Sequence, residues 1–272
     1  MELRHEMEQK LGLIGAGNMA GAILDGVLGS GLIPAEHLAV SDPDGAKRER
    51  YRLRGVFTSA ENRAVAERSD IILLAVKPQV LSGVLPELAA CAAGKCVVSI
   101  APGFSVSYLK ENLPGCYIIR AMPNTPLQVG KGVTALAEAP EVPEPLFRAV
   151  EAIFSAAGAV TVVPEQQMNA VTALTSSSPA YFFRMADAME KGAAALGMEP
   201  GEALRLAALT MEGAARVLLE SGRTAEELTR QVCSPGGTTL AALTAFDEFR
   251  FDEMIRLAME RCARRAEELG EW

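Results

Sequence analysis

The chain has 272 residues, of which 49% are hydrophobic, and its formal net charge is −8. This length is enough for two domains with a substantial core, and the acidic balance argues against nucleic acid or an anionic membrane as a partner. No apolar stretch reaches the length of a membrane span, and the charged N-terminus has no apolar signal segment. Five cysteines without a CxxC pair are typical of reduced thiols. We therefore expect a cytoplasmic protein.

Short apolar strands alternate with helical patterns in the first part of the chain. Residues 10–15 are expected to form a strand of the fully buried type, followed by a helix from about Asn18 to Gly29. Further strands are expected at 38–41, 55–58, 71–76, 96–100, 117–122 and 132–136, with helices such as 46–53 and 61–69 in the gaps. Strands separated by helices at this spacing predict an α/β fold with a parallel, doubly wound sheet of the Rossmann type.

The pattern changes near residues 160–164. Beyond that point helices are expected at 166–174, 179–196, 201–221, 225–231, 239–246 and 250–269, with no clear strand signal. The sequence therefore predicts two domains, a dinucleotide-binding domain at 1–163 and an all-helical domain at 164–272.

A glycine turn follows the first strand, with the sequence Gly15-Ala16-Gly17-Asn18-Met19-Ala20. Gly15 permits the tight turn, Gly17 lets the backbone approach a diphosphate, and Ala20 is small enough for close packing of helix on strand. The pattern predicts dinucleotide binding at the start of the following helix. A plain turn between strand and helix is the alternative.

The second expected strand ends in Ser41, Asp42 and Pro43, where the adenosine ribose of a bound cofactor would lie. The hydroxyl of Ser41 suits a 2′-phosphate, whereas Asp42 would repel one if it faced the site. Lys47 and Arg48 offer compensating charge, although such a cluster is also typical of a solvated helix face. These residues favour NADPH and leave NADH as an alternative.

Two later segments end strands at the same edge of the sheet, where ligands of open α/β sheets bind. Ala75-Val76-Lys77-Pro78-Gln79 is expected to border the cofactor, unless Lys77 is simply an exposed lysine before a helix. In Met122-Pro123-Asn124-Thr125-Pro126, two prolines bracket a polar turn. The turn either presents Asn124 to the nicotinamide end or is merely structural.

A second glycine turn, Ser234-Pro235-Gly236-Gly237-Thr238-Thr239, opens a helix in the second half. The amides at Gly236 and Gly237 and the hydroxyls of Thr238 and Thr239 would together hold a carboxylate at the helix start. A plain helix-start turn is the alternative. A chain with both glycine turns suggests an enzyme that brings a nicotinamide cofactor to a small carboxylate substrate.

The histidines and lysines narrow the chemistry. His5 and His37 lie in the N-terminal tail and before the second strand, and Lys191 is the only lysine after Pro164. Ketone or alcohol chemistry commonly needs His or Lys as a proton partner, whereas an imine nitrogen is protonated before reduction. The sequence therefore favours C=N over C=O chemistry. Thr172 and Ser178 supply small hydroxyls for a substrate, although Ser178 followed by Pro179 also explains a capped helix start. No metal site is expected.

These motifs together closely resemble the pyrroline-5-carboxylate reductase family over nearly the whole chain. The most specific motif is Val232-Cys233-Ser234-Pro235-Gly236-Gly237-Thr238-Thr239. The resemblance implies hydride transfer from NADPH to the imine carbon of L-1-pyrroline-5-carboxylate, giving L-proline, the last step of proline biosynthesis. It also implies a helical domain that dimerises, with five dimers assembled in some members.

The resemblance also assigns site residues. Cofactor contacts fall on Ile14, Gly15, Ala16, Gly17, Asn18, Met19, Ser41, Pro43, Asn62, Ala75, Val76, Lys77, Pro78, Ile100, Ala101 and Pro102. Substrate contacts fall on Gly236, Gly237, Thr238 and Thr239, with Thr239 the candidate to bond the ring nitrogen.

Two departures keep alternatives open. Ser176-Ser177-Ser178 stands where the family has glycines flanking one serine. Gly222-Arg223-Thr224 stands where the family commonly has an acidic residue followed by His-Pro. One alternative is a reductase of another cyclic imine acid, and another is an inactive nucleotide-binding regulator. A β-hydroxyacid dehydrogenase is disfavoured, because residues 166–174 contain no lysine.

Overall fold

The computed structural model describes residues 7–270, which form two compact units. One unit runs to Ser177 and also includes the chain from Cys262 onward, and the other is Ser178–Arg261. The N-terminal tail with His5 lies outside the described residues. No helix in the described part of the chain combines the length and apolar character needed to cross a bilayer.

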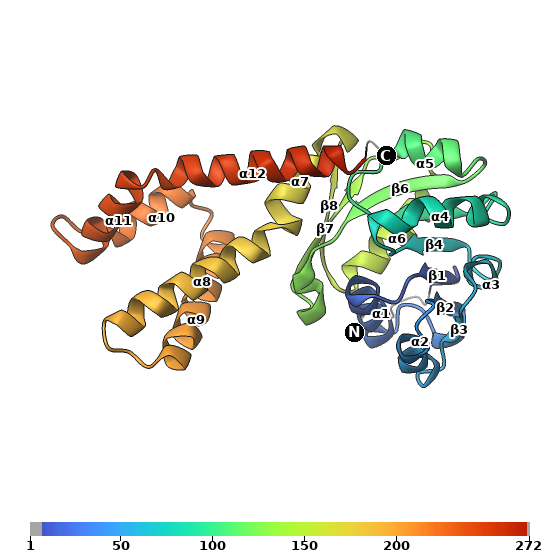
Figure 1. Ribbon diagram of the computed structural model, residues 1–272, viewed down its shortest axis with the longest axis horizontal. Coiled ribbons are helices and arrows are strands. Elements are labelled where there is room, and N and C mark those ends of the chain that lie inside the picture. The colour runs from blue at the N-terminus through green and yellow to red at the C-terminus, as the bar shows by residue number, and fades with distance from the viewer. Residues whose placement is uncertain (1–6, 271–272) are drawn as a thin grey trace. The chain divides into compact units, whose positions relative to one another are not determined.

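The first unit is built on a sheet that has eight strands within residues 7–270 (Figure 1). The strands are β1 (Leu11–Ile14), β2 (Leu38–Ser41), β3 (Phe57–Ser59), β4 (Ile71–Leu74), β5 (Cys96–Ser99), β6 (Tyr117–Met122), β7 (Gly132–Ala137) and β8 (Gly158–Val163). Their order is β3-β2-β1-β4-β5-β6-β7-β8. The central strands β1, β4 and β5 are buried along their whole length, which is why their sequences read as continuous apolar runs.

The pairing is parallel except between β6 and β7, which are antiparallel. The expected parallel, doubly wound sheet is therefore confirmed, and the β6–β7 pair is its one antiparallel exception within the described residues. Residues 123–131, between β6 and β7, hold only a 3₁₀ turn at Thr125–Val129. A parallel crossover needs about a dozen residues or more, so the chain turns back on itself.

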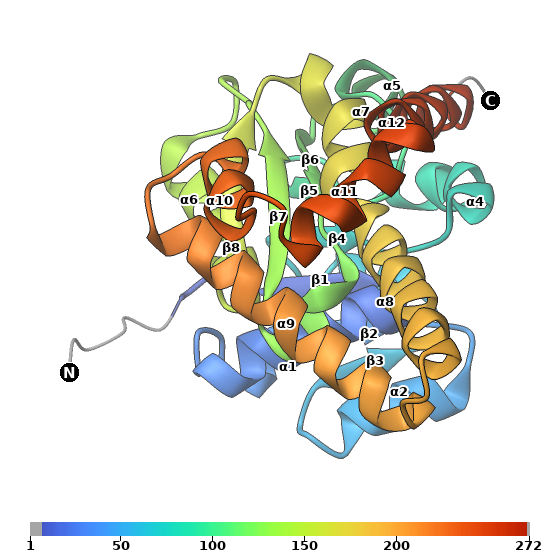
Figure 2. The ribbon, with the colours of Figure 1, turned by 90° about the vertical axis from the view of Figure 1, so that its left-hand side faces the viewer.

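Helices cover both faces of this sheet (Figures 1 and 2). α1 (Asn18–Ser30), α2 (Gly45–Arg52) and α6 (Glu144–Ser155) contribute to the hydrophobic cluster on one face. α3 (Asn62–Ala66), α4 (Pro78–Ala89) and α5 (Val106–Asn112) contribute to the cluster on the other. One helix in each layer begins at a side-chain cap. The side chain of Asp44 accepts a hydrogen bond from the Ala46 amide at the start of α2, and Ser105 caps α5 in the same way.

The segment after β8 differs from the single helix expected at 166–174. It consists of a 3₁₀ turn at Glu165–Gln167, the short helix α7 (Met168–Val171) and a π-helical turn at Thr172–Ser176. Met168 is fully buried against β6 and β7. This packing keeps the segment in the first unit, so the compact units divide later in the chain than the domain boundary predicted near Pro164.

The second unit is helical throughout its described residues, as expected. It contains α8 (Ser178–Ala195), α9 (Pro200–Glu220), α10 (Ala225–Val232), α11 (Thr238–Glu248) and the first part of α12 (Phe251–Glu268). α8 and α9 lie side by side (Figures 1 and 2). Thr224 and Glu227 form a reciprocal capping box at the start of α10.

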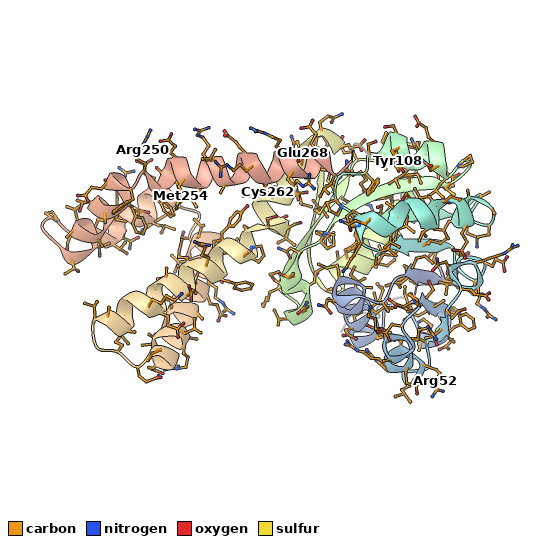
Figure 3. The ribbon with its side chains drawn as sticks, viewed as in Figure 1. Arg52, Tyr108, Arg250, Met254, Cys262 and Glu268 are labelled. Atoms are coloured by element: carbon orange, nitrogen blue, oxygen red, sulfur yellow. The ribbon has the colours of Figure 1, made fainter. Side chains whose placement is uncertain are left out.

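The last turns of α12 belong to the first unit. Figure 3 labels Cys262 and Glu268 on this part of the helix. The thiol of Cys262 donates a hydrogen bond to the hydroxyl of Ser177 over 3.1 Å. Gly103, with φ at +91°, packs so closely on the helix end that an added Cβ would lie 2.8 Å from the carbonyl oxygen of Ala266. The chain end therefore contacts the loop that follows β5.

Candidate functional site

A cleft of about 420 Å³ opens at the carboxyl ends of β1, β2 and β4 in the first unit. This is the edge at which open α/β sheets bind ligands, and the volume is that of a ligand pocket. The lining residues are Gly15, Gly17, Ser41, Asp42, Pro43, Lys47, Ala60, Asn62, Ala75, Val76, Lys77, Val80 and Val84. Eight of the predicted cofactor residues are therefore brought together here, namely Gly15, Gly17, Ser41, Pro43, Asn62, Ala75, Val76 and Lys77.

The glycine turn after β1 has the geometry of an anion site. Gly15 has φ at +99°, and an added Cβ would lie 2.8 Å from the carbonyl oxygen of Ala75, so only glycine fits there. An added Cβ on Gly17 would instead meet nothing within 4 Å. Gly17 caps α1 without a side-chain hydrogen bond, and the first turn of α1 has no acidic residue. The first amides of α1 are thus free to bind a diphosphate, so the turn fits a dinucleotide.

Asp42 does not present a free carboxylate to the cleft. Its two carboxylate oxygens accept hydrogen bonds from the amides of Ala16, over 2.8 Å, and Asp44, over 2.9 Å. The side chain is almost fully buried, and the ammonium of Lys47 lies 3.6 Å away. Because both oxygens are engaged by backbone amides, Asp42 fixes the glycine turn, and Lys47 lies close enough to offset part of its charge.

A chain of side-chain hydrogen bonds runs from the end of β2 to α4. The hydroxyl of Ser41 donates to Oδ1 of Asn62 over 2.8 Å, and Nδ2 of Asn62 donates to the carboxylate of Glu87 over 2.9 Å. The other oxygen of Glu87 accepts from the backbone amide of Arg63 over 3.1 Å. Sequence inspection missed Glu87, because its place late in α4 carries no motif, and only the fold brings it to Asn62.

The other predicted cofactor residues lie near this cleft without lining it. Ile14, Ala16 and Ala101 are buried, Met19 is half-buried, and Ile100 and Pro102 lie in the loop after β5. Asn18 and Pro78 line two separate hollows of the same unit, each of about 290 Å³. Contacts of these residues with a cofactor stay predictions.

Asn124 uses both polar atoms of its side chain within the protein. Its Oδ1 accepts from the amide of Val133 over 2.8 Å, and its Nδ2 donates to the carbonyl of Thr175 over 3.0 Å. The neighbouring Ser176 hydroxyl donates to the carbonyl of Pro123 over 3.0 Å. These bonds fit the structural alternative for this turn, while a contact between Asn124 and a nicotinamide stays a prediction.

The second glycine turn joins α10 to α11 in the other unit. Gly236 has φ at +69°, and the amide of Gly237 donates to the carbonyl of Ser234 over 2.9 Å. Gly237 caps α11 without a side-chain hydrogen bond. Thr238 is exposed and Thr239 half-buried, and within residues 7–270 neither hydroxyl has a hydrogen-bond partner. The turn thus offers the Thr238 and Thr239 hydroxyls at a helix start, as a carboxylate requires, whereas the Gly237 amide is already bonded to Ser234.

Thr172 and Ser178, predicted as substrate residues, fall in different units. Thr172 is buried, and its hydroxyl donates to the carbonyl of Met168 over 2.8 Å. Ser178 is half-buried at the start of α8. His37 lies before β2, at the strand end opposite the cleft, and Lys191 on α8 pairs with Asp187 at 2.7 Å. Among the described residues, no group of three or more His, Cys, Asp or Glu side chains is arranged to hold a metal ion.

A doubly wound sheet with a glycine turn at its ligand edge, joined to a helical unit, is typical of nicotinamide-dependent oxidoreductases of the Rossmann class. Comparison with protein families agrees. Residues 10–103 match the family described as NADP oxidoreductase, coenzyme F420-dependent, and residues 165–269 match pyrroline-5-carboxylate reductase dimerisation.

Individual relatives extend these matches over the whole chain. Pyrroline-5-carboxylate reductase from Synechocystis is 39% identical over 97% of this chain and 99% of its own length. The enzyme of that name from Haemophilus influenzae is 40% identical over 97% and 98%. A solved pyrroline-5-carboxylate reductase structure from Coxiella burnetii is 32% identical, covers 98% of this chain and 100% of its own, and superposes with a TM-score of 0.89. The chain belongs to the pyrroline-5-carboxylate reductase family.

Proposed function

We propose that this protein reduces the imine L-1-pyrroline-5-carboxylate to L-proline with NADPH, the last step of proline biosynthesis, in the cytoplasm. The observation that carries the proposal is that relatives named for this activity align with the chain from end to end at 39–40% identity. The cleft of the first unit supports it independently, because its glycine turn and free helix amides suit a dinucleotide.

Different residues of the first unit bind different parts of the cofactor. The amides at the start of α1 face the diphosphate, and Ser41 and Asn62 lie where the adenosine ribose is held at the end of the second strand. Lys77, which follows β4, adds positive charge at the cleft. NADPH, when bound, supplies the hydride, and NADH is the alternative donor.

The residues of the second unit bind the substrate. Its carboxylate lies against Gly236 and Gly237 and accepts hydrogen bonds from the Gly236 amide and the Thr238 hydroxyl, because the Gly237 amide is bonded to Ser234. The hydroxyl of Thr239 bonds the ring nitrogen. Thr239 is the catalytic residue of this proposal, since it touches the reacting imine. The described residues place no histidine at either glycine turn, which suits an imine because its nitrogen is protonated before reduction.

The family's dimerisation region covers all of the second unit, which indicates an oligomer. Its helices carry large apolar side chains that are exposed in the single chain, such as Phe183 on α8 and Leu209 on α9. Apolar patches of this kind mark interaction surfaces. We propose a homodimer, and a decamer of five dimers as its higher assembly.

The deciding experiment follows NADPH absorbance with racemic pyrroline-5-carboxylate and, in parallel, with a six-membered cyclic imine acid. We expect faster turnover of the five-membered substrate. Faster turnover of the six-membered ring would favour another cyclic imine as substrate, whereas NADPH binding without oxidation of either mixture would indicate a regulator. The Ser176 and Ser177 hydroxyls already bond to Pro123 and Cys262, so the serine run does not by itself argue for a different ring size.

A further inference from the structure

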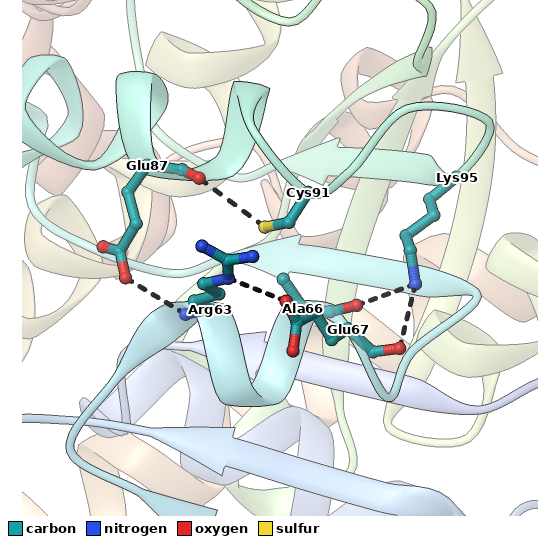
Figure 4. A network of polar contacts seen from close by, with 6 residues as sticks. All are labelled: Arg63, Ala66, Glu67, Glu87, Cys91 and Lys95. Atoms are coloured by element: carbon teal, nitrogen blue, oxygen red, sulfur yellow. Dashed lines mark hydrogen bonds and ion pairs between the residues drawn. The ribbon is translucent and has the colours of Figure 1, made fainter.

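At the adenosine end of the cleft, Glu87 determines which way the hydrogen bonds of Asn62 and Ser41 point. Glu87 lies outside the cleft lining, but its carboxylate bonds both Asn62 and the Arg63 amide at the start of α3. Figure 4 shows Glu87 reaching from α4 to Arg63, whose guanidinium pairs on its other side with Glu67. A carboxylate only accepts hydrogen bonds, so the atom of Asn62 that faces Glu87 must be Nδ2.

This constraint passes along the chain of bonds to Ser41. Because Nδ2 of Asn62 faces Glu87, Oδ1 faces Ser41, and Oδ1 can only accept. The single hydroxyl hydrogen of Ser41 is therefore committed to Asn62. For a bond to a ribose, the Ser41 oxygen then offers only its lone pairs. These can accept a hydrogen bond from the 2′-hydroxyl of NADH. An ionised 2′-phosphate is an acceptor and gains no bond until that hydrogen is released.

We propose that Glu87 is a positioning residue that sets the direction of the Ser41–Asn62 bond and thereby limits the preference for NADPH over NADH. The inference rests on the proposed dinucleotide function and adds a residue to it. Glu87 does not line the cleft, and it reaches the cofactor site through its bond to Asn62.

The isosteric change Glu87→Gln inverts the relay. The Arg63 amide still requires an acceptor, so the carbonyl oxygen of the introduced glutamine faces Arg63 and its amide nitrogen faces Asn62. Asn62 then turns its Oδ1 toward that nitrogen and its Nδ2 toward Ser41, and Ser41 becomes an acceptor. Its hydroxyl hydrogen is released for a 2′-phosphate, without any loss of hydrogen bonds in the protein. Because Glu87 is exposed and the new side chain has the same shape, the fold is retained.

The test is direct binding of NADPH and of NADH to the full chain, by titration without any imine. We expect the ratio of the NADH to the NADPH dissociation constant to rise about tenfold in Glu87→Gln, the effect of one hydrogen bond to a charged group. Glu67→Gln is the matched control, because it removes a neighbouring negative charge and leaves the Asn62 bonds intact. The ratio in this control should stay within about twofold of wild type.

A second pair of variants isolates the relay. In an Asn62→Ala background, which cuts the path to Ser41, adding Glu87→Gln should change the ratio by less than about twofold. Three outcomes would each overturn the inference and leave the proposed function intact. The ratio of dissociation constants could be unchanged in Glu87→Gln, or it could rise equally in Glu67→Gln. It could also rise in full when Glu87→Gln is added to the Asn62→Ala variant. Failure of the wild-type protein to bind either cofactor would overturn both.

Discussion

The carboxylate of Asp42 accepts a hydrogen bond from the backbone amide of Ala16 over 2.8 Å. This bond ties the residue after β2 to the middle of the glycine turn after β1. The other oxygen of Asp42 accepts from the amide of Asp44 over 2.9 Å. One buried carboxylate therefore fixes the loop after β1 against the loop after β2. Both bonds need an acceptor oxygen, so the side chain must carry two of them.

Asp42→Asn should lower the free energy of unfolding by about 1–3 kcal/mol, because one of the two donor amides then meets an amide nitrogen and loses its bond. Urea denaturation measures the change. Asp44→Asn is the control: Asp44 is exposed and caps α2, and asparagine is an equally good cap, so the change should stay within about 0.5 kcal/mol. Equal losses in both variants would contradict the bracing role of Asp42.

Gly17→Ala should leave the protein folded but weaken NADPH binding. The added methyl group meets no protein atom within 4 Å, so it occupies space that the proposal gives to the diphosphate. Forcing a methyl into a filled space costs roughly 1–3 kcal/mol, or about ten- to a hundredfold in the dissociation constant. Gly29→Ala on the same helix also meets open space and should bind NADPH normally. An unweakened Gly17→Ala would move the diphosphate elsewhere.

Thr239→Ala should depress turnover by about ten- to a hundredfold, since a hydrogen bond to a charged group contributes roughly 1.5–3 kcal/mol. The dissociation constant for NADPH should hardly change, because the cofactor cleft belongs to the other compact unit. Thr244→Ala on the same helix is the control, since Thr244 is exposed and bonds only the Ala241 carbonyl. Wild-type turnover in Thr239→Ala would remove this residue from catalysis.

Leu209→Glu should dissociate the oligomer. Light scattering coupled to size-exclusion chromatography measures the resulting loss of molecular mass. Leu209 on α9 is 52% exposed in the single chain, and burying a charge at an apolar interface is unfavourable. Leu53→Glu provides the matched control. Leu53, which is 72% exposed, belongs to the first unit and falls outside the dimerisation match, so its variant should keep the wild-type mass. Loss of mass only in the control would point to an interface on the first unit.

Cys96 should resist alkylation in the folded protein. Burial raises the pKa of its thiol to about 12. Because the raised pKa keeps the thiol protonated, the reactive thiolate is scarce at pH 8 and appears only as the pH approaches that value. Peptide mapping after iodoacetamide treatment should find Cys96 modified in urea and unmodified without it. Equal labelling under both conditions would show that the strand β5 opens readily.

Much of the first unit could be predicted from sequence because its signals are local. The fully buried runs at β1, β2 and β4 and the glycine turn at Gly15 stand out in the sequence before any of their contacts are known. β8 has no clear sequence signal, because Gly158–Val163 is a half-exposed edge strand whose short Val-rich run coincides with the change from alternating elements to helices. The antiparallel pairing of β6 and β7 had a usable signal in the short connection 123–131, which leaves no room for a crossover.

The site was less accessible to sequence analysis, because its contacts join distant segments. The hydrogen bonds between Asp42 and Ala16 and between Asn62 and Glu87 form because the fold brings the loop after β2 to the loop after β1 and places α3 against α4. The sequence places Asn124 after a strand at the ligand edge and leaves open a contact with the nicotinamide or a purely structural turn, and its bonds to Thr175 and Val133 could not be foreseen from that position. Propensity and motif cannot foresee such side-chain pairings.

The contact between Gly103 and the last turn of α12 means that the nucleotide-binding unit is discontinuous in the chain. The helical unit is an insertion within it, entered after Ser177 and left at Arg261. During synthesis the sheet and its covering helices emerge before α12, so the loop after β5 gains this contact only after the helical unit has been made. A change in the last turn of α12 would therefore be felt at Gly103, far away in sequence.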